Sequence, residues 1–259
     1  MLLAVNIQNN GIAIGWFCER RLCGRISLSA DARRTADEYL LLLQLAADRR
    51  GLCPSDVRSV ILASVVPSLT ETVERALREA FPAAPVMRVG PGLRTGFAIR
   101  LSDPAELGAD LAADIAGAVH LLGAPVLIAD LGAVSALSVV NREGAYVGGA
   151  LLPGIGESLA AMQAAELLPD VTAEDDVPLI GRSTVACMRS GVIRGQAAAI
   201  DGLLASYRRE LSLPEDTPIV VTGQYAERVL PYLASAVRHV PDLSLLGLLR
   251  LYEINAGRA

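Results

Sequence analysis

Residues 125–132, Pro-Val-Leu-Ile-Ala-Asp-Leu-Gly, form an apolar run that ends in a small polar turn almost halfway along the chain. Residues 2–11, Leu-Leu-Ala-Val-Asn-Ile-Gln-Asn-Asn-Gly, repeat this arrangement near the N-terminus. A short apolar run followed by turn residues predicts a buried strand. The turn after such a strand can offer backbone N–H groups to a phosphate. The two stretches predict two copies of one phosphate-binding device, although only the second contains an acid, Asp130.

The composition sets broad limits on the class of protein. The 259 residues are 52% apolar, 20% charged and 4% aromatic, which suffices for one large domain or two small ones with aliphatic cores. All 23 basic residues are arginine, so a P-loop lysine and Schiff-base chemistry are excluded. The sequence also lacks the basic, aromatic-interleaved patches of nucleic-acid binders, so we expect no nucleic-acid partner.

Contact with a membrane is not expected either. No uncharged apolar stretch approaches the ~20 residues that span a bilayer. The N-terminus has neither the basic region nor the cleavage site of a signal peptide, and it resembles the start of a strand. We therefore expect a cytoplasmic protein.

The cysteines and histidines do not suggest a metal site. The four cysteines form no C-x-x-C pair, and the two histidines lie far apart in the sequence. A zinc site is therefore not expected. In a cytoplasmic protein the four cysteines are expected to be reduced structural thiols.

The pattern of apolar runs and turn signals predicts alternating strands and helices. The expected strands are 2–5, 11–18, 21–28, 59–66, 86–89, 126–130, 136–141, 145–150 and 219–222. The expected helices are 35–50, 68–80, 103–122 with an interruption at Gly108, 158–168, 184–211, 225–236 and 244–255. Three strands followed by a helix and a strand, twice over, predict an α/β fold of two similar lobes with a cleft between them. The expected N-terminal lobe is 1–120 and the C-terminal lobe is 121–259.

Three turns at strand ends are candidates for nucleotide binding. Residues 6–11 and 130–135 are the phosphate candidates. Residues 222–224, Thr-Gly-Gln, are an adenosine candidate, because glycine lets a flat base approach the backbone. Each turn alone is more often structural, but their matching places in the two halves favour a nucleotide-binding cleft.

Asp110 and Asp114 are the next candidates. Their i,i+4 spacing places both carboxylates on one helix face, where two like charges are mildly destabilising. One of them could bind a metal or abstract a proton. The alternative is a solvated first helical turn, in which acids favour the helix dipole.

Two further motifs have ordinary structural explanations. Residues 181–184, Gly-Arg-Ser-Thr, precede a long expected helix, and either Ser183 or Thr184 can be its N-cap. Residues 148–156 form a glycine-rich turn between a strand and a helix. This turn either exposes backbone to a ligand or packs tightly.

The chain resembles the type III pantothenate kinases over nearly its whole length. The residues that carry the resemblance lie in order along the sequence and include Arg34-Thr-Ala-Asp-Glu-Tyr39, Ala63-Ser-Val-Val-Pro67, Val89-Gly-Pro-Gly-Leu-Arg-Thr-Gly96, Asp103-Pro-Ala-Glu-Leu-Gly-Ala-Asp110, Asp130-Leu-Gly132, Gly148-Gly-Ala-Leu-Leu-Pro-Gly-Ile155, Ile180-Gly-Arg-Ser-Thr184, Met188-Arg-Ser-Gly191 and Leu245-Leu-Gly-Leu-Leu-Arg-Leu-Tyr-Glu-Ile-Asn255.

This resemblance implies two ribonuclease-H-like lobes of the actin-like ATPase fold, shared with acetate and sugar kinases and Hsp70, usually in a dimer. It implies phosphoryl transfer from ATP to the hydroxyl of pantothenate, towards coenzyme A. It also implies a divalent metal such as Mg²⁺ and a monovalent cation, K⁺ or NH₄⁺.

The resemblance also implies roles for individual residues. Asp110 matches the general base, and Asp130 matches the ligand of the monovalent cation. The residues that match the nucleotide site are Asn6, Gln8, Asn9, Asn10, Gly132, Ala133, Ser135 and Gly223. The residues that match the substrate site are Gly92, Arg94, Thr95, Gly96, Gly108 and Thr184.

The nucleotide motifs depart from the family pattern. The first family motif reads Asp-x-Gly-Asn-Thr-x, so Asn6 replaces the Asp, Gln8 the Gly and Asn10 the Thr. Leu111 replaces an arginine, and Gln224 replaces a glycine. Kinases work mainly by positioning phosphates and neutralising their charge, so each such loss is expected to cost about 2–4 kcal/mol of transition-state stabilisation.

Two hypotheses follow. The first is a kinase for pantothenate or a related small hydroxyl compound, with activity reduced or lost through these changes. The second is a non-catalytic pseudokinase that acts as a regulator or partner subunit. The expected assembly is a homodimer, or a heteromer with an intact paralogue.

Overall fold

The structure is a computed structural model that describes residues 1–165, 168–173 and 176–256. The chain divides into two compact units. The first unit contains residues 1–97, residues 102–120 and the segment that begins at Leu243. The second unit contains residues 98–101 and 121–242. The C-terminal helix thus groups with the first unit, whereas the expected lobes divide the chain only once, after residue 120.

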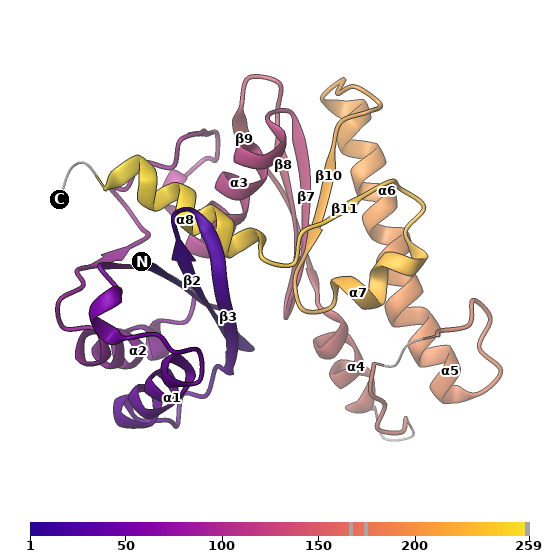
Figure 1. Ribbon diagram of the computed structural model, residues 1–259. Helices are drawn as coiled ribbons and strands as arrows, with labels where there is room; N and C mark the ends of the chain where they lie inside the picture. The colour runs from indigo at the N-terminus through magenta and orange to yellow at the C-terminus, as the bar shows by residue number, and fades with distance from the viewer. Residues whose placement is uncertain (166–167, 174–175, 257–259) are drawn as a thin grey trace. The chain divides into compact units, whose positions relative to one another are not determined.

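The first unit is built on a five-stranded mixed sheet, which begins with the indigo strands of Figure 1. Its first three strands pair antiparallel as a meander. The fourth strand pairs parallel with the first, and the fifth pairs parallel with the fourth. The order across the sheet is β3-β2-β1-β4-β5. The strands are β1 (Leu2–Ile7), β2 (Gly11–Cys18), β3 (Arg21–Ser29), β4 (Ser59–Ser64) and β5 (Val86–Arg88).

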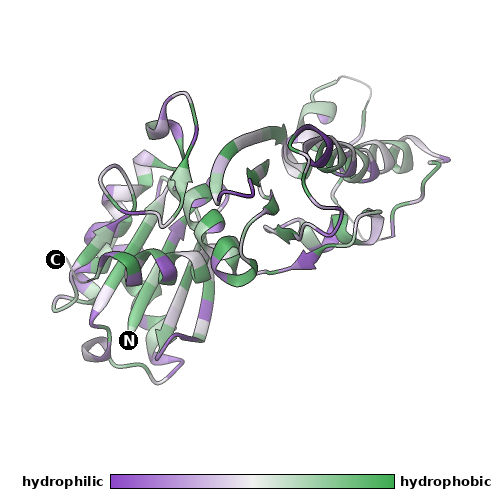
Figure 2. Cartoon of the chain, turned by 90° about the horizontal axis from the view of Figure 1, so that it is seen from above, coloured by the Kyte–Doolittle hydropathy of each residue, from purple (hydrophilic) through white to green (hydrophobic). Residues whose placement is uncertain are grey.

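Helices cover both faces of this sheet. They are α1 (Ala36–Asp48), α2 (Pro67–Ala80), α3 (Ala109–Leu122) and α8 (Leu243–Asn255). Because strand side chains alternate between faces, Leu3 and Val5 of β1 belong to the apolar core under α1 and α2, whereas Ala4 belongs to the core under α3 and α8. Figure 2 shows mainly hydrophobic residues along these strands.

Local sequence signals explain where these helices begin. The Thr35 hydroxyl accepts a hydrogen bond from the Glu38 N–H at 3.3 Å, and the Glu38 carboxylate accepts one from the Thr35 N–H at 2.7 Å. This capping box starts α1. The expected cap at Asp103 also forms, since its carboxylate accepts from the Ala105 N–H at 2.9 Å. It caps only a 3₁₀ turn, Pro104–Glu106, and α3 begins later, after Gly108.

The second unit repeats the pattern of the first. Its strands β7, β8 and β9 pair antiparallel, and β10 and β11 add parallel to β7. The order is β11-β10-β7-β8-β9-β6, in which β6 pairs parallel with β9. Two mixed sheets of this kind confirm the α/β fold of two similar lobes. The strands are β6 (Ala98–Ile99), β7 (Val126–Leu131), β8 (Val134–Val140), β9 (Ala145–Pro153), β10 (Ile219–Thr222) and β11 (Arg238–His239).

The helices of the second unit pack on a core that includes Leu127, Ile193 and Ile200. They are α4 (Ile155–Gln163), α5 (Thr184–Arg189), a π-helical turn (Ser190–Arg194), α6 (Gly195–Glu210) and α7 (Ala226–Val229). In Figure 1, α6 is the long orange helix beside β10 and β11.

Several sequence predictions of helices differ from the structure. The expected helix 184–211 is interrupted by the π-helical turn at Ser190–Arg194. The expected helix 225–236 is wrong beyond Tyr232: α7 is followed by a 3₁₀ turn, Leu230–Tyr232, because Pro231 supplies no N–H to continue the helix. The expected helix 158–168 begins earlier, at Ile155, and its residues 166 and 167 lie outside the described residues.

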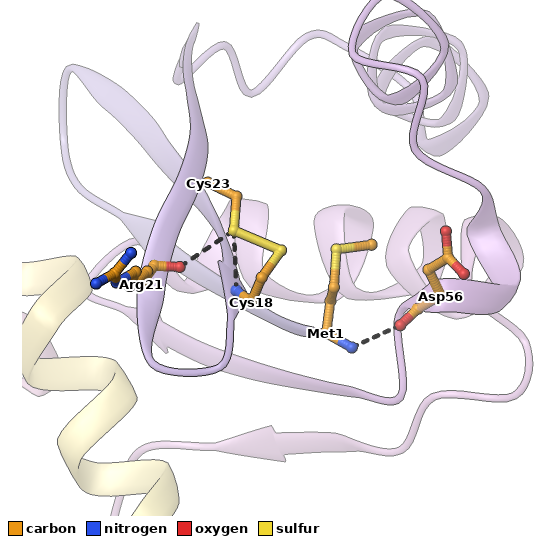
Figure 3. Close-up of a disulfide and its surroundings, with 5 residues drawn as sticks. All are labelled: Met1, Cys18, Arg21, Cys23 and Asp56. Atoms are coloured by element: carbon orange, nitrogen blue, oxygen red, sulfur yellow. Dashed lines mark hydrogen bonds between the residues drawn. A yellow bond between two sulfur atoms is a disulfide. The ribbon is translucent and has the colours of Figure 1, made fainter.

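The prediction of four reduced thiols is wrong for one pair. Cys18 and Cys23 form a disulfide across the end of the β2–β3 hairpin (Figure 3), with 6.1 Å between their Cα atoms. The two residues of the connecting turn, Glu19 and Arg20, both have positive φ, which brings the two strand ends back together. A register shift in this hairpin leaves Cys23 of β3 without a paired residue on β2, the strand that carries Cys18. Cys53 and Cys187 are free and exposed.

Within the described residues, no helix combines the length and the apolar character needed to cross a bilayer.

Helices α3 and α8 touch backbone to backbone. A Cβ atom on Gly247 would overlap the carbonyl oxygen of Ala113, and one on Gly117 would lie 2.7 Å from the carbonyl oxygen of Leu243. Backbone atoms cannot yield as a flexible side chain can. Glycine is therefore required at both positions for the two helices to approach this closely.

We predict that Gly247→Ala lowers the free energy of unfolding by at least about 2 kcal/mol, because the added methyl group forces the helices apart. The control is Gly202→Ala in α6, where a Cβ meets nothing within 4 Å. That substitution is expected to stabilise the protein by about 0.5–1 kcal/mol, since alanine loses less conformational entropy than glycine in a helix. Urea unfolding followed by circular dichroism measures both, and equal effects of the two substitutions would contradict the close contact.

Candidate functional site

Asn6 lies at the carboxyl end of β1 and is completely buried. It is the fifth residue of a six-residue strand and faces the same side of the sheet as Ala4, towards the core under α3 and α8. Both polar atoms of its amide are buried without a hydrogen-bond partner in the described part of the chain. Such a group costs free energy unless something else satisfies it, so this position is a candidate for ligand binding.

The turn after β1 carries the other three nucleotide candidates of the first unit. The Gln8 N–H donates to the Gly11 carbonyl at 2.8 Å, which closes the turn. Asn9 and Asn10 form its exposed tip. This small polar turn between two strands is the arrangement that the sequence predicted.

Asp110 is the second residue of α3 and is partly buried. Burial raises the pKa of its carboxyl group, because the charged form loses solvation there, and the hydrogen bonds to the carboxylate only partly oppose this. One of them comes from the Leu111 N–H at 2.7 Å. A carboxylate with a raised pKa is a better proton acceptor than an ordinary surface aspartate.

Gly108 makes room for this carboxylate. A Cβ atom at Gly108 would lie 2.8 Å from the Asp110 Oδ1 atom and 3.5 Å from the side chain of Val65. The Val65 N–H in turn donates to the Ile7 carbonyl at 3.1 Å. The first unit therefore brings Asp110 and Gly108 together near the end of β1, where Asn6 lies.

The loop 90–97 contains four of the substrate candidates. Gly92 and Gly96 have φ of +89° and +82°, a conformation that other residues rarely adopt. The Thr95 hydroxyl donates to the Phe97 carbonyl at 2.8 Å, and the Arg94 side chain is exposed. Phe97 packs on the same core as Ala109 of α3, so the loop shares this core with the helix that carries Asp110.

The turn between β7 and β8 is the equivalent element of the second unit and consists of Gly132 and Ala133. The Gly154 N–H donates to the Ala133 carbonyl at 2.9 Å, and a Cβ on Gly154 would overlap the carbonyl oxygens of this turn. Gly154 is also the N-cap of α4. The amino end of a nine-residue helix thus lies against the predicted phosphate turn, and such helix ends attract anions.

Asp130 and Gly223 meet at the ends of their neighbouring parallel strands. Asp130 is the fifth residue of six-residue β7, is 5% exposed and pairs in register with Thr222 of β10. A Cβ on Gly223 would lie 2.5 Å from the Asp130 Oδ1 atom. Gly223 has φ +96°, so glycine is required both for its conformation and for this approach.

The remaining candidates of the second unit have different surroundings. Ser135 is buried, and its hydroxyl accepts a hydrogen bond from the Gln196 side chain at 2.5 Å, so it ties β8 to α6. Thr184 is exposed at the first position of α5, whose N-cap is Ser183. Of the two caps that the sequence left open for this helix, Ser183 supplies it, accepting from the Ala186 N–H at 3.2 Å.

Sequence reasoning did not single out Gly154 and Gln196 as site residues. The glycine-rich stretch 148–156 was a signal for Gly154, although it did not distinguish packing from ligand contact. No local pattern indicated Gln196, since its contact with Ser135 joins residues 61 positions apart.

The residues at the end of β1 do not by themselves fit a divalent metal. Among the described residues no group of three or more His, Cys, Asp and Glu side chains could hold one. Asn6 offers a neutral oxygen where a carboxylate would balance part of the ion's charge. We therefore assign no chemical step to a metal at this position.

Two solved structures resemble the whole chain. One is a Campylobacter jejuni protein named as a conserved member of the Baf family of transcriptional activators, with TM-score 0.63, 14% sequence identity, and coverage of 98% of this chain and 99% of that one. The other is component A of the (R)-2-hydroxyglutaryl-CoA dehydratase of Acidaminococcus fermentans, with TM-score 0.56, 12% identity and 98% coverage of each chain. Together with the two mixed sheets, these similarities confirm the actin-like ATPase fold.

Sequence comparisons show the family. The model of the type III pantothenate kinases matches residues 2–206. The type III pantothenate kinase of Moorella thermoacetica is 34% identical over 256 residues, which cover 98% of this chain and all of that protein. The enzyme of the same name from Dehalococcoides mccartyi is 35% identical over 257 residues, with 98% coverage of each. The chain belongs to the type III pantothenate kinase family.

We predict that Asp110→Asn stabilises the folded protein at neutral pH. The raised pKa means that the folded state holds this proton more tightly than the unfolded chain does. The stability that Asp110 contributes is complete below the ordinary value of 3.8 and is lost as pH rises through the higher folded-state pKa. The free energy of unfolding of Asp110→Asn, relative to that of wild type, should therefore grow between pH 3 and pH 8, as measured by urea unfolding. Asp103→Asn, at an exposed cap, is the control for removing one charge, and an advantage of Asp110→Asn that shrinks with pH would contradict the burial of the charge.

Proposed function

We propose that this protein transfers the γ-phosphoryl group of ATP to the hydroxyl of pantothenate, as its relatives are named for, and that it does so at a much reduced rate. The observation that carries the proposal is Asp110. It is a partly buried carboxylate of raised pKa at the start of α3, with space left for it by Gly108. Family membership makes ATP and a small-molecule acceptor the expected substrates.

In this mechanism Asp110 is the general base. The substrate hydroxyl attacks the γ-phosphorus, the bond from phosphorus to the bridging oxygen of ATP breaks, and the hydroxyl proton passes to the Asp110 carboxylate. Because burial raises its pKa, this carboxylate binds the proton more readily than an exposed aspartate would. Its hydrogen bond from the Leu111 N–H holds the carboxylate in one orientation.

The loop 90–97 is the proposed site for the acceptor substrate. The exposed Arg94 guanidinium suits the carboxylate of pantothenate, because a guanidinium forms paired, charge-assisted hydrogen bonds with a carboxylate. Gly92 has no atom within 4 Å of a built Cβ position, so the substrate can approach the backbone there. In the second unit, Thr184 is exposed on α5, and its contact with the substrate stays a prediction from the family resemblance.

The turn Gly132–Ala133 is the proposed phosphate site of the second unit. It lies against the amino end of α4, where N–H groups and the helix dipole favour an anion. Gly223 remains the proposed neighbour of the adenosine. Asp130 is the proposed ligand of K⁺ or NH₄⁺, and a homodimer in the cytoplasm is the proposed form of the protein.

The reduction in rate follows from the first unit. Asn6 is neutral and completely buried at the position where the family motif has a carboxylate. Gln8 adds a side chain in a turn where the family motif has glycine, and Leu111 provides no guanidinium. Losses of about 2–4 kcal/mol each would together lower the rate by several orders of magnitude.

A pseudokinase is the second candidate, and the state of the Asn6 amide favours it. A neutral group in this position avoids the large cost of burying a carboxylate that no cation balances. A protein that no longer uses the divalent metal gains stability from this change. Such a protein would act as a ligand sensor, or as a regulatory partner of an intact paralogue.

We predict that Asp110→Asn lowers kcat for pantothenate phosphorylation by about 10²- to 10⁴-fold, the usual contribution of a general base. The expected wild-type turnover is slow but measurable in a coupled ADP-release assay. Asp103→Asn, at a surface cap outside the site, should leave kcat unchanged. Wild-type ADP release that does not depend on pantothenate, across several divalent metals, would favour the pseudokinase.

We predict that Asn6→Asp combined with Gln8→Gly raises the affinity for Mg-ATP by at least roughly tenfold, since a carboxylate pair with the metal is worth more than 1.4 kcal/mol. Titration calorimetry at pH 7.5 measures the change. Asn6→Ala with Gln8→Gly is the control, because it opens the turn without adding charge. If the unmodified protein already binds Mg-ATP at micromolar Kd and the double variant binds no better, the first nucleotide motif is not weakened.

A further inference from the structure

Asn255, the last residue of α8, holds the backbone of Arg94 from both sides. Its Oδ1 atom accepts a hydrogen bond from the Arg94 N–H at 3.1 Å, and its Nδ2 atom donates to the Arg94 carbonyl at 2.9 Å. The same Nδ2 atom donates to the Leu251 carbonyl at 2.8 Å. Both hydrogens of the amide are thus used, and the side chain has one fixed orientation.

The last turn of α8 is itself well anchored. The Tyr252 hydroxyl donates to the Ser59 hydroxyl at 2.8 Å. The Arg20 guanidinium donates to both carboxylate oxygens of Glu253, at 2.5 and 2.9 Å. Nearer the start of the helix, the backbone contact of Gly247 fixes α8 against α3. Asn255 therefore projects from a rigid platform that is fastened to the helix carrying Asp110.

The loop that Asn255 holds packs on the apolar core through Leu93 and Phe97, and its own hydrogen bonds lie mainly within the loop. Gly92 and Gly96 have positive φ, and nothing surrounds the Cβ position of Gly92. The Leu93 N–H donates to the Gly90 carbonyl at 3.1 Å, a bond within the loop itself. Besides the Asn255 amide, α8 contacts the loop through Ile254, whose side chain lies 2.7 Å from a Cβ built on Gly96. The amide is thus a polar attachment of the loop to the platform.

We propose that Asn255 is a positioning residue for the acceptor substrate: it fixes the Arg94 backbone so that the exposed Arg94 guanidinium meets the substrate's carboxylate in one orientation. This inference rests on the proposed kinase function. Asn255 does not touch the reacting atoms, and it acts through the loop alone. Holding a substrate in one geometry accounts for a large part of catalysis, and small displacements of such a group are costly.

Only an amide of this length fits the geometry. Replacement by aspartate keeps the size and one acceptor for the Arg94 N–H, but its second oxygen would face the carbonyl oxygens of Arg94 and Leu251. Alanine removes all three bonds. Both substitutions should therefore release the loop, the first by repulsion between oxygens and the second by loss of contact.

Steady-state kinetics of the full-length protein test this inference. Asn255→Ala and Asn255→Asp should each raise KM for pantothenate by about 10- to 100-fold, with KM for ATP within about twofold of wild type. Hydrogen exchange of the Arg94 amide, followed by mass spectrometry of the peptide that contains it, should speed up in both variants. Tyr252→Phe is the matched control, because it removes a hydrogen bond from the same helical turn without touching the loop. Its KM for pantothenate should equal that of wild type.

Two results would overturn the inference while leaving the proposed function intact. One is a wild-type KM for pantothenate in Asn255→Ala. The other is that Asn255→Ala changes kcat, KM for ATP and thermal stability by the same amounts as Tyr252→Phe does, which would show a purely structural role. Absence of pantothenate-dependent turnover in the wild-type protein is a different result, since it refutes the proposed function and the inference together.

Discussion

The backbone contact between α3 and α8 is the constraint on which the first unit's candidate site depends. Gly117 and Gly247 let the two helices approach until backbone atoms touch, so the helices hold each other in place. The first of these helices carries Asp110 near its start. The second carries Asn255 at its end. The partly buried Asp110 carboxyl group and the Asn255 amide are thereby set at fixed places on one side of one sheet, although 145 positions separate them in the sequence.

The sequence indicated much of the fold because its signals are local. Apolar runs and glycine punctuation predicted strands such as β7, and the Thr35 capping box marked the start of α1. Short elements such as β6 were missed, because two residues carry no periodicity. The contact between Asn255 and Arg94 was missed for another reason. It joins residues 161 positions apart, and nothing in either neighbourhood specifies the other.

The places of some candidate site residues were also predicted, because local sequence signals mark them. The strand-end turns at Asn6 and Asp130 could be identified from the residues that flank them. The resemblance to a family selected Asp110, and its partial burial gives that choice a physical basis in the raised pKa. Whether a polar side chain has partners cannot be deduced from local sequence. The buried amide of Asn6 and the hydroxyl of Ser135, bonded to Gln196, could be distinguished only in the folded chain.

The two units place different groups at the same point of the same topology. Asn6 and Asp130 are each the fifth residue of a six-residue central strand, each pairs with a parallel strand on one side and an antiparallel strand on the other, and each is buried. Asp130 keeps a carboxyl group that the neighbouring Gly223 leaves room for. Asn6 keeps the shape of an acid without its charge. A buried carboxylate is stable only with a cation or hydrogen-bond donors nearby. A neutral amide at the same position needs no cation. This difference between the two copies is the basis of the proposal that the first unit holds metal and phosphate less tightly, while Asp110 and the loop that Asn255 holds are the proposed contacts of the acceptor.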